Sequence, residues 1–231
     1  MDNKAFELLD VMEGTWWYKG RMRAVTAATA ALPSGNAVLD FGAGLGGMKD
    51  FLSKLGKQVY AFEPSSSGEQ KLKLRGYTEV FSSLKAALQI KYDYICLFDV
   101  LEHIEDDKGF LKILREEAPE STVVLTVPAF MFLWGEHDVK HQHFRRYTKK
   151  SITKLFHEQG YTVMYARYWN VAMFPVAALL RLIGKTGESS TRLPKFLDTL
   201  LYGIVFVDTW LNKYVNLPFG VSLVCVAIPK K

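Results

Sequence analysis

The sequence predicts an α/β fold in which helices cover both faces of a mostly parallel sheet. Short apolar runs recur between residues 37 and 127, segments with helical character separate them, and a glycine-rich turn follows the first run. Continuous apolar strands that alternate with helices are typical of parallel sheets buried on both faces. A chain of 231 residues suffices for one such domain.

Seven segments are predicted as strands: 37–40, 58–62, 78–81, 92–98, 121–127, 161–168 and 221–228. A helical cap is expected over residues 1–32, before the first strand. Further helices are expected at 48–55, 66–75 and 108–117, the last with Asp106 or Asp107 as its N-cap.

Residues 170–216 interrupt this alternation before the last strand. Two apolar helices are expected there, at 171–183 and 195–215, joined by the polar loop GKTGESSTR. The second helix has an apolar face, from which Asp198, Thr209, Asn212 and Lys213 point away. The face comprises Leu197, Leu200, Leu201, Ile204, Val207 and Leu211. Such a face could pack on the domain, on a second subunit, on a membrane surface or on a long apolar tail.

The first predicted strand leads into the glycine-rich turn FGAGLGG. Glycines let the backbone turn tightly and approach a ligand at the start of the next helix. Gly42, Gly44 and Gly47 fit the dinucleotide pattern G-x-G-x-x-G, whereas Gly42, Gly44 and Gly46 fit the loop that binds S-adenosylmethionine (SAM). Asp40 favours SAM, because its carboxylate would repel a pyrophosphate but attract the ammonium and sulfonium groups of SAM.

Three motifs together resemble the class I SAM-dependent methyltransferases: VLDFGAGLGG, AFEP and FDVLEHIEDD. The bacterial type 11/12 branch is the nearer resemblance, because it also has an N-terminal WW-aromatic-x-x-R element and a segment like VPAFMFLWGEHDVKHQHFRRYT. The resemblance covers roughly residues 10–168 and the last strand. It implies one Rossmann-like domain over 1–231, with a seven-stranded, mostly parallel sheet, an N-terminal helical element and a helical insertion before the last strand.

The resemblance also implies S-adenosyl-L-methionine as the cofactor and assigns residues to it. These are Asp40, Gly42, Gly44 and Gly46 around the methionine and ribose, Glu63 at the ribose, Asp99 on the methionine side, and Arg21 at the SAM carboxylate. Trp17 and His103 are expected on the acceptor side. Core packing of the Trp16–Tyr18 aromatics, and a scaffold role for Asp99 and His103, stay open as alternatives.

The segment after the third strand departs from the family pattern. Many relatives place an acid there for the adenine amino group, but no acid occurs between Glu79 and Asp93. Ser82, Ser83 or a backbone group would have to make this contact.

Methyl transfer is an in-line displacement, which needs a base only if the acceptor loses a proton. The candidate bases are His137, His141 and His143, in the segment after the fifth strand. With Asp138 they also have the residue types of metal ligands. We expect no metal, because the resembled family does not generally use one.

Residues 139–157 contain six Lys or Arg, three His and no acid. Such a run is either a solvated surface or part of a site for an anionic acceptor, with Arg145 and Arg146 as bidentate contacts. Nucleic acid is not expected as a partner, because few aromatics flank the run and no RNA-binding module is present.

Composition places the protein among ordinary globular chains, with 49% hydrophobic and 23% charged residues and a net charge of +5. Cys96 and Cys225 lie in apolar runs and are expected to be buried thiols. The chain start has no signal-peptide core, and no uncharged apolar run is long enough to span a membrane. A cytoplasmic location is expected, with peripheral membrane contact or a homodimer through 170–216 as further expectations.

The sequence therefore predicts a SAM-dependent methyltransferase, with O-methylation of a small or lipid-linked acceptor as the expected reaction. The acceptor could be anionic, envelope-related or isoprenoid. Two alternatives stay open: a nicotinamide-dependent oxidoreductase that uses the same glycines, and a non-catalytic SAM-binding partner subunit that docks through its apolar helices.

Overall fold

A computed structural model describes residues 14–184, 193–212 and 214–230 of the chain. Its strands form one seven-stranded sheet in the order β3-β2-β1-β4-β5-β7-β6. They are β1 (Gly35–Phe41), β2 (Gly56–Phe62), β3 (Val80–Phe81), β4 (Tyr94–Phe98), β5 (Thr122–Pro128), β6 (Tyr161–Trp169) and β7 (Ser222–Pro229). Only β7 runs against its neighbours, and it pairs with both β5 and β6. The predicted fold class and all seven strands are confirmed.

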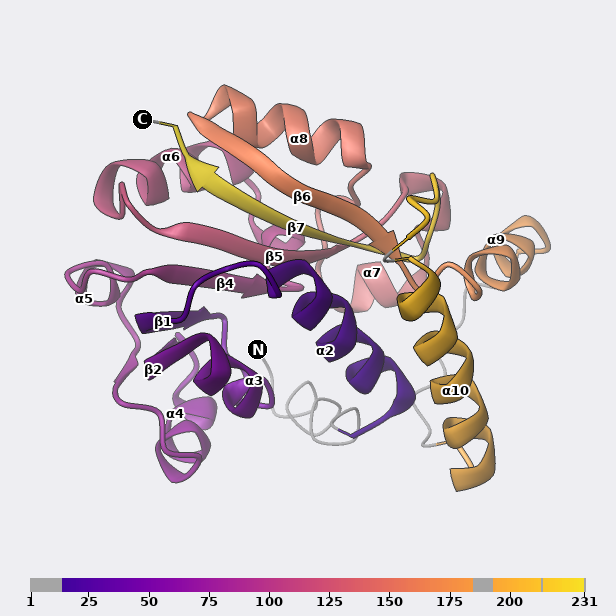
Figure 1. Cartoon of the computed structure of the whole chain (residues 1–231), viewed down its shortest axis with the longest axis horizontal. Coiled ribbons are helices and arrows are strands. Elements are labelled where there is room, and N and C mark those ends of the chain that lie inside the picture. The colour runs from indigo at the N-terminus through magenta and orange to yellow at the C-terminus, as the bar shows by residue number, and fades with distance from the viewer. Residues whose placement is uncertain (1–13, 185–192, 213, 231) are drawn as a thin grey trace.

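Helices connect these strands and cover the sheet (Figure 1). They are α2 (Trp16–Thr29), α3 (Lys49–Leu55), α4 (Ser66–Leu74), α5 (Leu84–Ala87), α6 (Asp107–Glu117), α7 (Glu136–Lys140), α8 (Lys149–Glu158), α9 (Phe174–Leu182) and α10 (Lys195–Leu211), with the 3₁₀ turns η1 (Leu101–His103) and η2 (Met131–Leu133). Residues 1–13 of the predicted N-terminal cap and residues 185–192 of the loop GKTGESSTR lie outside the described residues.

Two apolar cores lie on opposite faces of the sheet. On one face, α2 and α3 contribute Val25 and Leu52 to a cluster that includes Trp169 of β6. On the other, α6 and α8 contribute residues such as Leu111 and Phe156. Side chains of successive strand residues point to opposite faces of the sheet. A strand that is buried on both faces is therefore apolar along its whole length. Cys96 and Cys225 are buried in β4 and β7, as expected.

α8 was not predicted, because its ten residues belong to the basic run, whose charges were considered ahead of its apolar positions. Thr148 caps this helix by accepting a hydrogen bond from the Ser151 amide at 3.1 Å. Ile152, Leu155 and Phe156 form the buried stripe. The basic segment is therefore a loop followed by an amphipathic helix.

α10 lies beside α2 (Figure 1) and packs on it through an unusually close contact. A Cβ atom on Gly20 would lie only 2.5 Å from Cγ1 of Val205, so glycine is what permits this approach. At its N-terminal end, Asp198 of α10 accepts a hydrogen bond from the Trp16 amide at 2.9 Å. The N-terminal helix and the insertion thus form one packed unit.

The buried side of α10 combines Val205 with polar residues, and the predicted apolar face of the helix points outward. Asp208, Thr209 and Asn212 are buried. The Asp208 carboxylate accepts hydrogen bonds from the amides of Val171 at 3.0 Å and Ala172 at 3.3 Å. The apolar residues Leu200, Ile204, Val207 and Leu211 are between 38% and 59% exposed.

Among the described residues, no helix is long and apolar enough to cross a membrane.

Candidate functional site

The glycine-rich turn lies where β1 ends, at the same edge of the sheet as the carboxyl ends of β2 and β4. Gly42, Gly44 and Gly46 all have positive φ angles, of 71°, 57° and 76°. Such backbone conformations strongly favour glycine. A Cβ atom on Gly42 would also lie 2.8 Å from Cγ2 of Val100. Both conformation and space therefore require glycine at position 42.

Glu63 is buried at the end of β2 and binds this turn directly. Its carboxylate accepts hydrogen bonds from the amide of Gly44 at 2.8 Å and from the amide of Ser65 at 3.0 Å. Burial raises the pKa of Glu63, and the two amide hydrogen bonds oppose that rise. The residue predicted to bind a ribose therefore also positions the loop around it.

Asp40 is buried at the end of β1 and pairs with a tyrosine that sequence reasoning missed. The hydroxyl of Tyr77 donates a hydrogen bond to Oδ2 of Asp40 at 2.5 Å. Burial raises the pKa of Asp40 to about 6, although the Tyr77 hydrogen bond and the charge of Arg21 oppose the rise. Tyr77 follows α4 in an ordinary loop, so no local pattern marked it.

The buried carboxyl of Asp40 makes stability depend on pH. Its folded pKa of about 6 exceeds its ordinary value of 3.8, so the folded state binds more protons and loses stability as pH rises from about 4 to about 6. Asparagine does not titrate in this range. We therefore expect the free energy of unfolding of Asp40→Asn, relative to that of the unmodified chain, to rise by about 3 kcal/mol across this window. Urea unfolding of both proteins at pH 4, 5, 6 and 7 measures it. A stability difference that is the same at every pH would contradict the assignment.

Asp99 follows β4 and joins it to the N-terminal helix. It has a φ angle of 55°, in the left-handed region. Its Oδ2 pairs with Nη1 of Arg21 at 2.7 Å, and its Oδ1 accepts from the hydroxyl of Thr126 at 2.9 Å. The structure therefore brings two predicted cofactor residues, Arg21 and Asp99, into direct contact.

Trp17 lies on the core side of the same helix. Its ring packs on Trp169 with a centroid distance of 4.8 Å, and it borders the apolar cluster on that face. This arrangement favours the core-packing interpretation of the aromatic run over the lid.

The three histidines after β5 lie together with His103. The ring centroids of His137 and His141 are 4.3 Å apart, and His143 lies 5.7 Å from His137 and 4.5 Å from His103. Residues from the turn after β4 and from the α7 segment thus form one histidine cluster, consisting of His103, His137, His141 and His143.

Asp138 organises one side of the histidine cluster. It is fully buried, and its Oδ1 lies 2.8 Å from Nδ1 of His143. Arg146 donates to both of its oxygens, from Nε at 2.8 Å and from Nη2 at 2.9 Å. Burial raises the pKa of Asp138, but the hydrogen bonds to His143 and Arg146 outweigh it, and the pKa lies well below its usual range. Arg146 is therefore engaged with Asp138 in this structure.

Arg145 is also engaged within the protein. Its Nη1 pairs with Asp107 at 2.8 Å, and it bonds the backbone carbonyl of Glu105. Three lysines of the basic run face elsewhere: Lys149, Lys150 and Lys154 line a cavity of about 800 Å³ beside Tyr168 of the edge strand β6. The basic residues therefore do not form one continuous surface.

Glu102 lies beneath the histidine cluster and is a buried acid without a hydrogen-bond partner among the described residues. Its side chain is fully buried, and neither carboxylate oxygen has a hydrogen-bond partner among the described residues. Burial and the nearby charge of Asp99 raise its pKa well above the usual range. Burial and then the neighbouring His143 lower the pKa of His103 to about 4.

The insertion helices adjoin the histidine-bearing segment. Arg181 of α9 donates to the carbonyl of Leu133 in η2 at 2.8 Å. The rings of Phe130, Phe132 and Phe174 also pack together at this junction. Beside the apolar face of α10 lies a cavity of about 600 Å³, lined mainly by Ala172, Leu200, Gly203, Ile204, Val207 and Leu211.

Comparison with known proteins agrees with this geometry. A family model described as a methyltransferase domain matches residues 17–166. No curated protein sequence matches the chain. The plantazolicin methyltransferase BpumL in complex with SAH is a similar structure, with a TM-score of 0.60 and 13% identity over 100% of this chain and 91% of that chain.

Two further solved structures share the fold. Magnesium protoporphyrin IX methyltransferase from Synechocystis PCC 6803 with bound SAH has a TM-score of 0.59 and 15% identity, over 99% of this chain and 95% of that chain. The [4+2]-cyclase SpnF has a TM-score of 0.56 and 13% identity, over 93% of this chain and 82% of that chain. At such low identity, these likenesses establish the fold alone.

Proposed function

Because the chain belongs to the class I SAM-dependent methyltransferases, we propose that it transfers a methyl group from SAM to an oxygen of a small or lipid-linked acceptor. The glycine turn held by Glu63, with Asp40 and Asp99 at the neighbouring strand ends, is the observation that supports the cofactor site. The buried carboxyl of Asp40 would face a cationic cofactor, which favours its ionised form. Membership of this family also argues against the alternative of a nicotinamide-dependent oxidoreductase.

The reaction needs little covalent chemistry from the protein. SAM supplies the methyl group on a cationic sulfur, and the protein's residues align the acceptor and exclude water. Arg21, held by Asp99, would bind the carboxylate end of the cofactor. A hydroxyl acceptor must lose its proton, and the histidine cluster is where we place that loss. Among its members, His143 is the one oriented by a buried carboxylate.

The apolar character of the acceptor is supported by the outward face of α10. Burying an exposed apolar face against a partner would contribute roughly 25 cal/mol of favourable free energy for each Å² removed from water. That face borders a cavity, and α9 connects the insertion to the segment that carries His137. An amphiphile could therefore place an apolar tail on the insertion and its hydroxyl at the histidines. Arg145, whose side chain is 29% exposed, would then face an anionic head group.

Cofactor binding gives the first test. Isothermal titration calorimetry should detect binding of SAM and of S-adenosylhomocysteine (SAH), and none of NAD. Asp40→Ala and Glu63→Ala should each weaken SAM binding by about 1–3 kcal/mol, since each removes a charged hydrogen-bond partner. Glu116→Ala, on the exposed side of α6, is the matched control and should bind SAM normally. Comparable affinity for NAD would refute the cofactor assignment.

Acceptor class is tested separately. The protein is incubated with SAM labelled in its methyl group and with an extract of its host cells, which is then divided into organic and aqueous phases. Label in the organic phase is the expected result for a lipid-linked acceptor, and label only in the aqueous phase would refute it. SAM binding without transfer to either phase would favour the non-catalytic partner subunit.

A further inference from the structure

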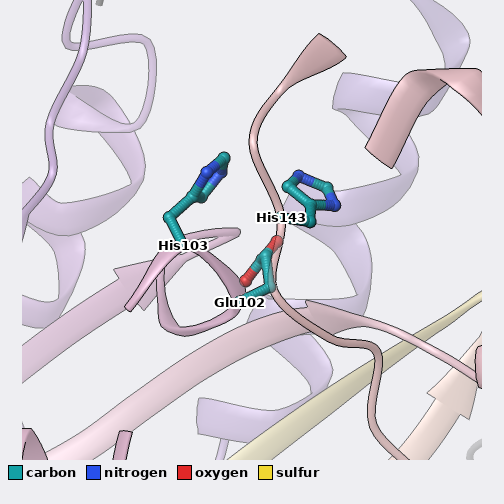
Figure 2. A group of neighbouring side chains, drawn as sticks. All are labelled: Glu102, His103 and His143. Carbon is teal, nitrogen blue, oxygen red and sulfur yellow. The ribbon is translucent and has the colours of Figure 1, made fainter. Parts of the chain in front are cut away.

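We propose that Glu102, His103 and His143 form a binding site for a divalent metal ion of the zinc type. Each residue offers one ligand atom, and the three atoms lie within 4.8 Å of one another. Figure 2 shows the two imidazole rings on either side of the space above the Glu102 carboxylate. Two histidines and one glutamate are a known donor set for Zn²⁺, with bonds of about 2.0–2.2 Å.

Glu102 points to a ligand independently of the histidines. A fully buried carboxylate normally accepts several hydrogen bonds or pairs with a cation, because its desolvation is costly. Glu102 is fully buried, and both of its oxygens lack a partner among the described residues. Its neighbour Asp99 adds a second negative charge, which Arg21 and the hydroxyl of Thr126 bond directly. A cation between the imidazoles would favour the ionised form of Glu102 and pair with it.

The surroundings of the two imidazoles match those of metal ligands. Metal-binding histidines usually donate their second ring nitrogen to a carboxylate or a backbone carbonyl, which fixes the ring and the tautomer. Nδ1 of His143 lies 2.8 Å from the buried carboxylate of Asp138. Because an ionised carboxylate only accepts hydrogen bonds, Nδ1 carries the proton and Nε2 stays available. His103 similarly has a hydrogen bond to the backbone of His141.

The role of the ion rests on the proposed function. Three protein ligands leave a coordination position open, and an acceptor hydroxyl could occupy it. The cation would lower the pKa of that hydroxyl, and its proton would leave to solvent. The oxygen then forms its bond to the methyl carbon while the carbon–sulfur bond breaks. The electron pair of that bond stays on sulfur, which leaves as the neutral thioether SAH.

Metal binding can be tested without any acceptor. The full-length chain, free of a histidine tag and stripped with a chelator, is titrated with Co²⁺ by visible absorption and with Zn²⁺ by calorimetry. We expect one equivalent of each ion to bind. Glu102→Gln and His143→Ala should each weaken binding more than 100-fold, because losing only an outer-shell partner already costs about 10–100-fold.

His157→Ala is the matched control, since His157 is exposed on α8 and is not a member of the histidine cluster. It should bind both ions as the unmodified chain does. Thermal unfolding checks that the variants are folded. If Glu102→Gln or His143→Ala does not fold, His103→Ala takes its place, because His103 is only partly buried. No stoichiometric binding, or binding that survives both ligand substitutions, would overturn the site. SAM titration of the metal-free protein separates this failure from that of the proposed function, because SAM can bind when no ion does.

Discussion

Replacing His143 with alanine is expected to lower the rate of methyl transfer by roughly 10²–10⁴-fold while the affinity for SAM is retained. The imidazole is held by the buried Asp138 at 2.8 Å, and its ring centroid lies 4.5 Å from that of His103. The loss is expected whether the ring accepts the acceptor's proton or binds a cation that activates the acceptor. Initial rates with labelled SAM and the acceptor-containing phase measure the rate of methyl transfer, and calorimetry measures the affinity for SAM.

His137→Ala and His141→Ala are the comparison variants, because both rings belong to the cluster. At most one of the three histidines can be the group that takes the proton, so the three losses should be unequal. Normal rates for all three variants at every pH would contradict proton loss at this cluster. An acceptor that needs no base would then be favoured.

The second large effect is expected on the outer face of α10. The double variant Leu200→Glu, Ile204→Glu places two charges on a face that is 59% and 38% exposed at these residues. It should abolish whichever association the unmodified chain shows, because burying a carboxylate against an apolar partner is costly. Liposome flotation detects a membrane surface, and sedimentation velocity detects a dimer.

Leu74→Glu is the matched control, because Leu74 is 83% exposed at the end of α4, far along the chain from the insertion. It should leave flotation and sedimentation unchanged. A concentration-independent monomer that ignores both anionic and neutral liposomes would contradict membrane and dimer together. Loss of SAM binding in the double variant would show that this face belongs to the core.

The strands and the glycine turn could be predicted from sequence because their causes are local. Each strand is a short apolar run with turn residues beside it, and the absence of a side chain permits the positive φ angles at Gly42, Gly44 and Gly46. The motifs around Asp40, Glu63 and Asp99 all lie at strand ends, and parallel pairing brings such ends to one edge of a sheet.

The remaining features depend on contacts between distant segments. Tyr77 reaches Asp40 across 37 positions of the chain, and nothing in its own neighbourhood reveals the hydrogen bond. The basic run suggested free arginines, but Arg146 is engaged by Asp138 and Arg145 by Asp107. The assigned roles of the cofactor and acceptor residues stay predictions until ligands are measured.

The reversed strand β7 has a consequence for how the protein folds as it is made. β6 has no other neighbour in the sheet, and β5 has β7 on one side. The edge of β5 therefore stays unpaired during synthesis until about 95 further residues, including α10, have followed it. Unpaired strand edges invite association between unfinished chains. Slow translation of this interval would prolong the exposure of the edge and lower the yield of folded protein, whereas a chaperone that covers the edge would raise it.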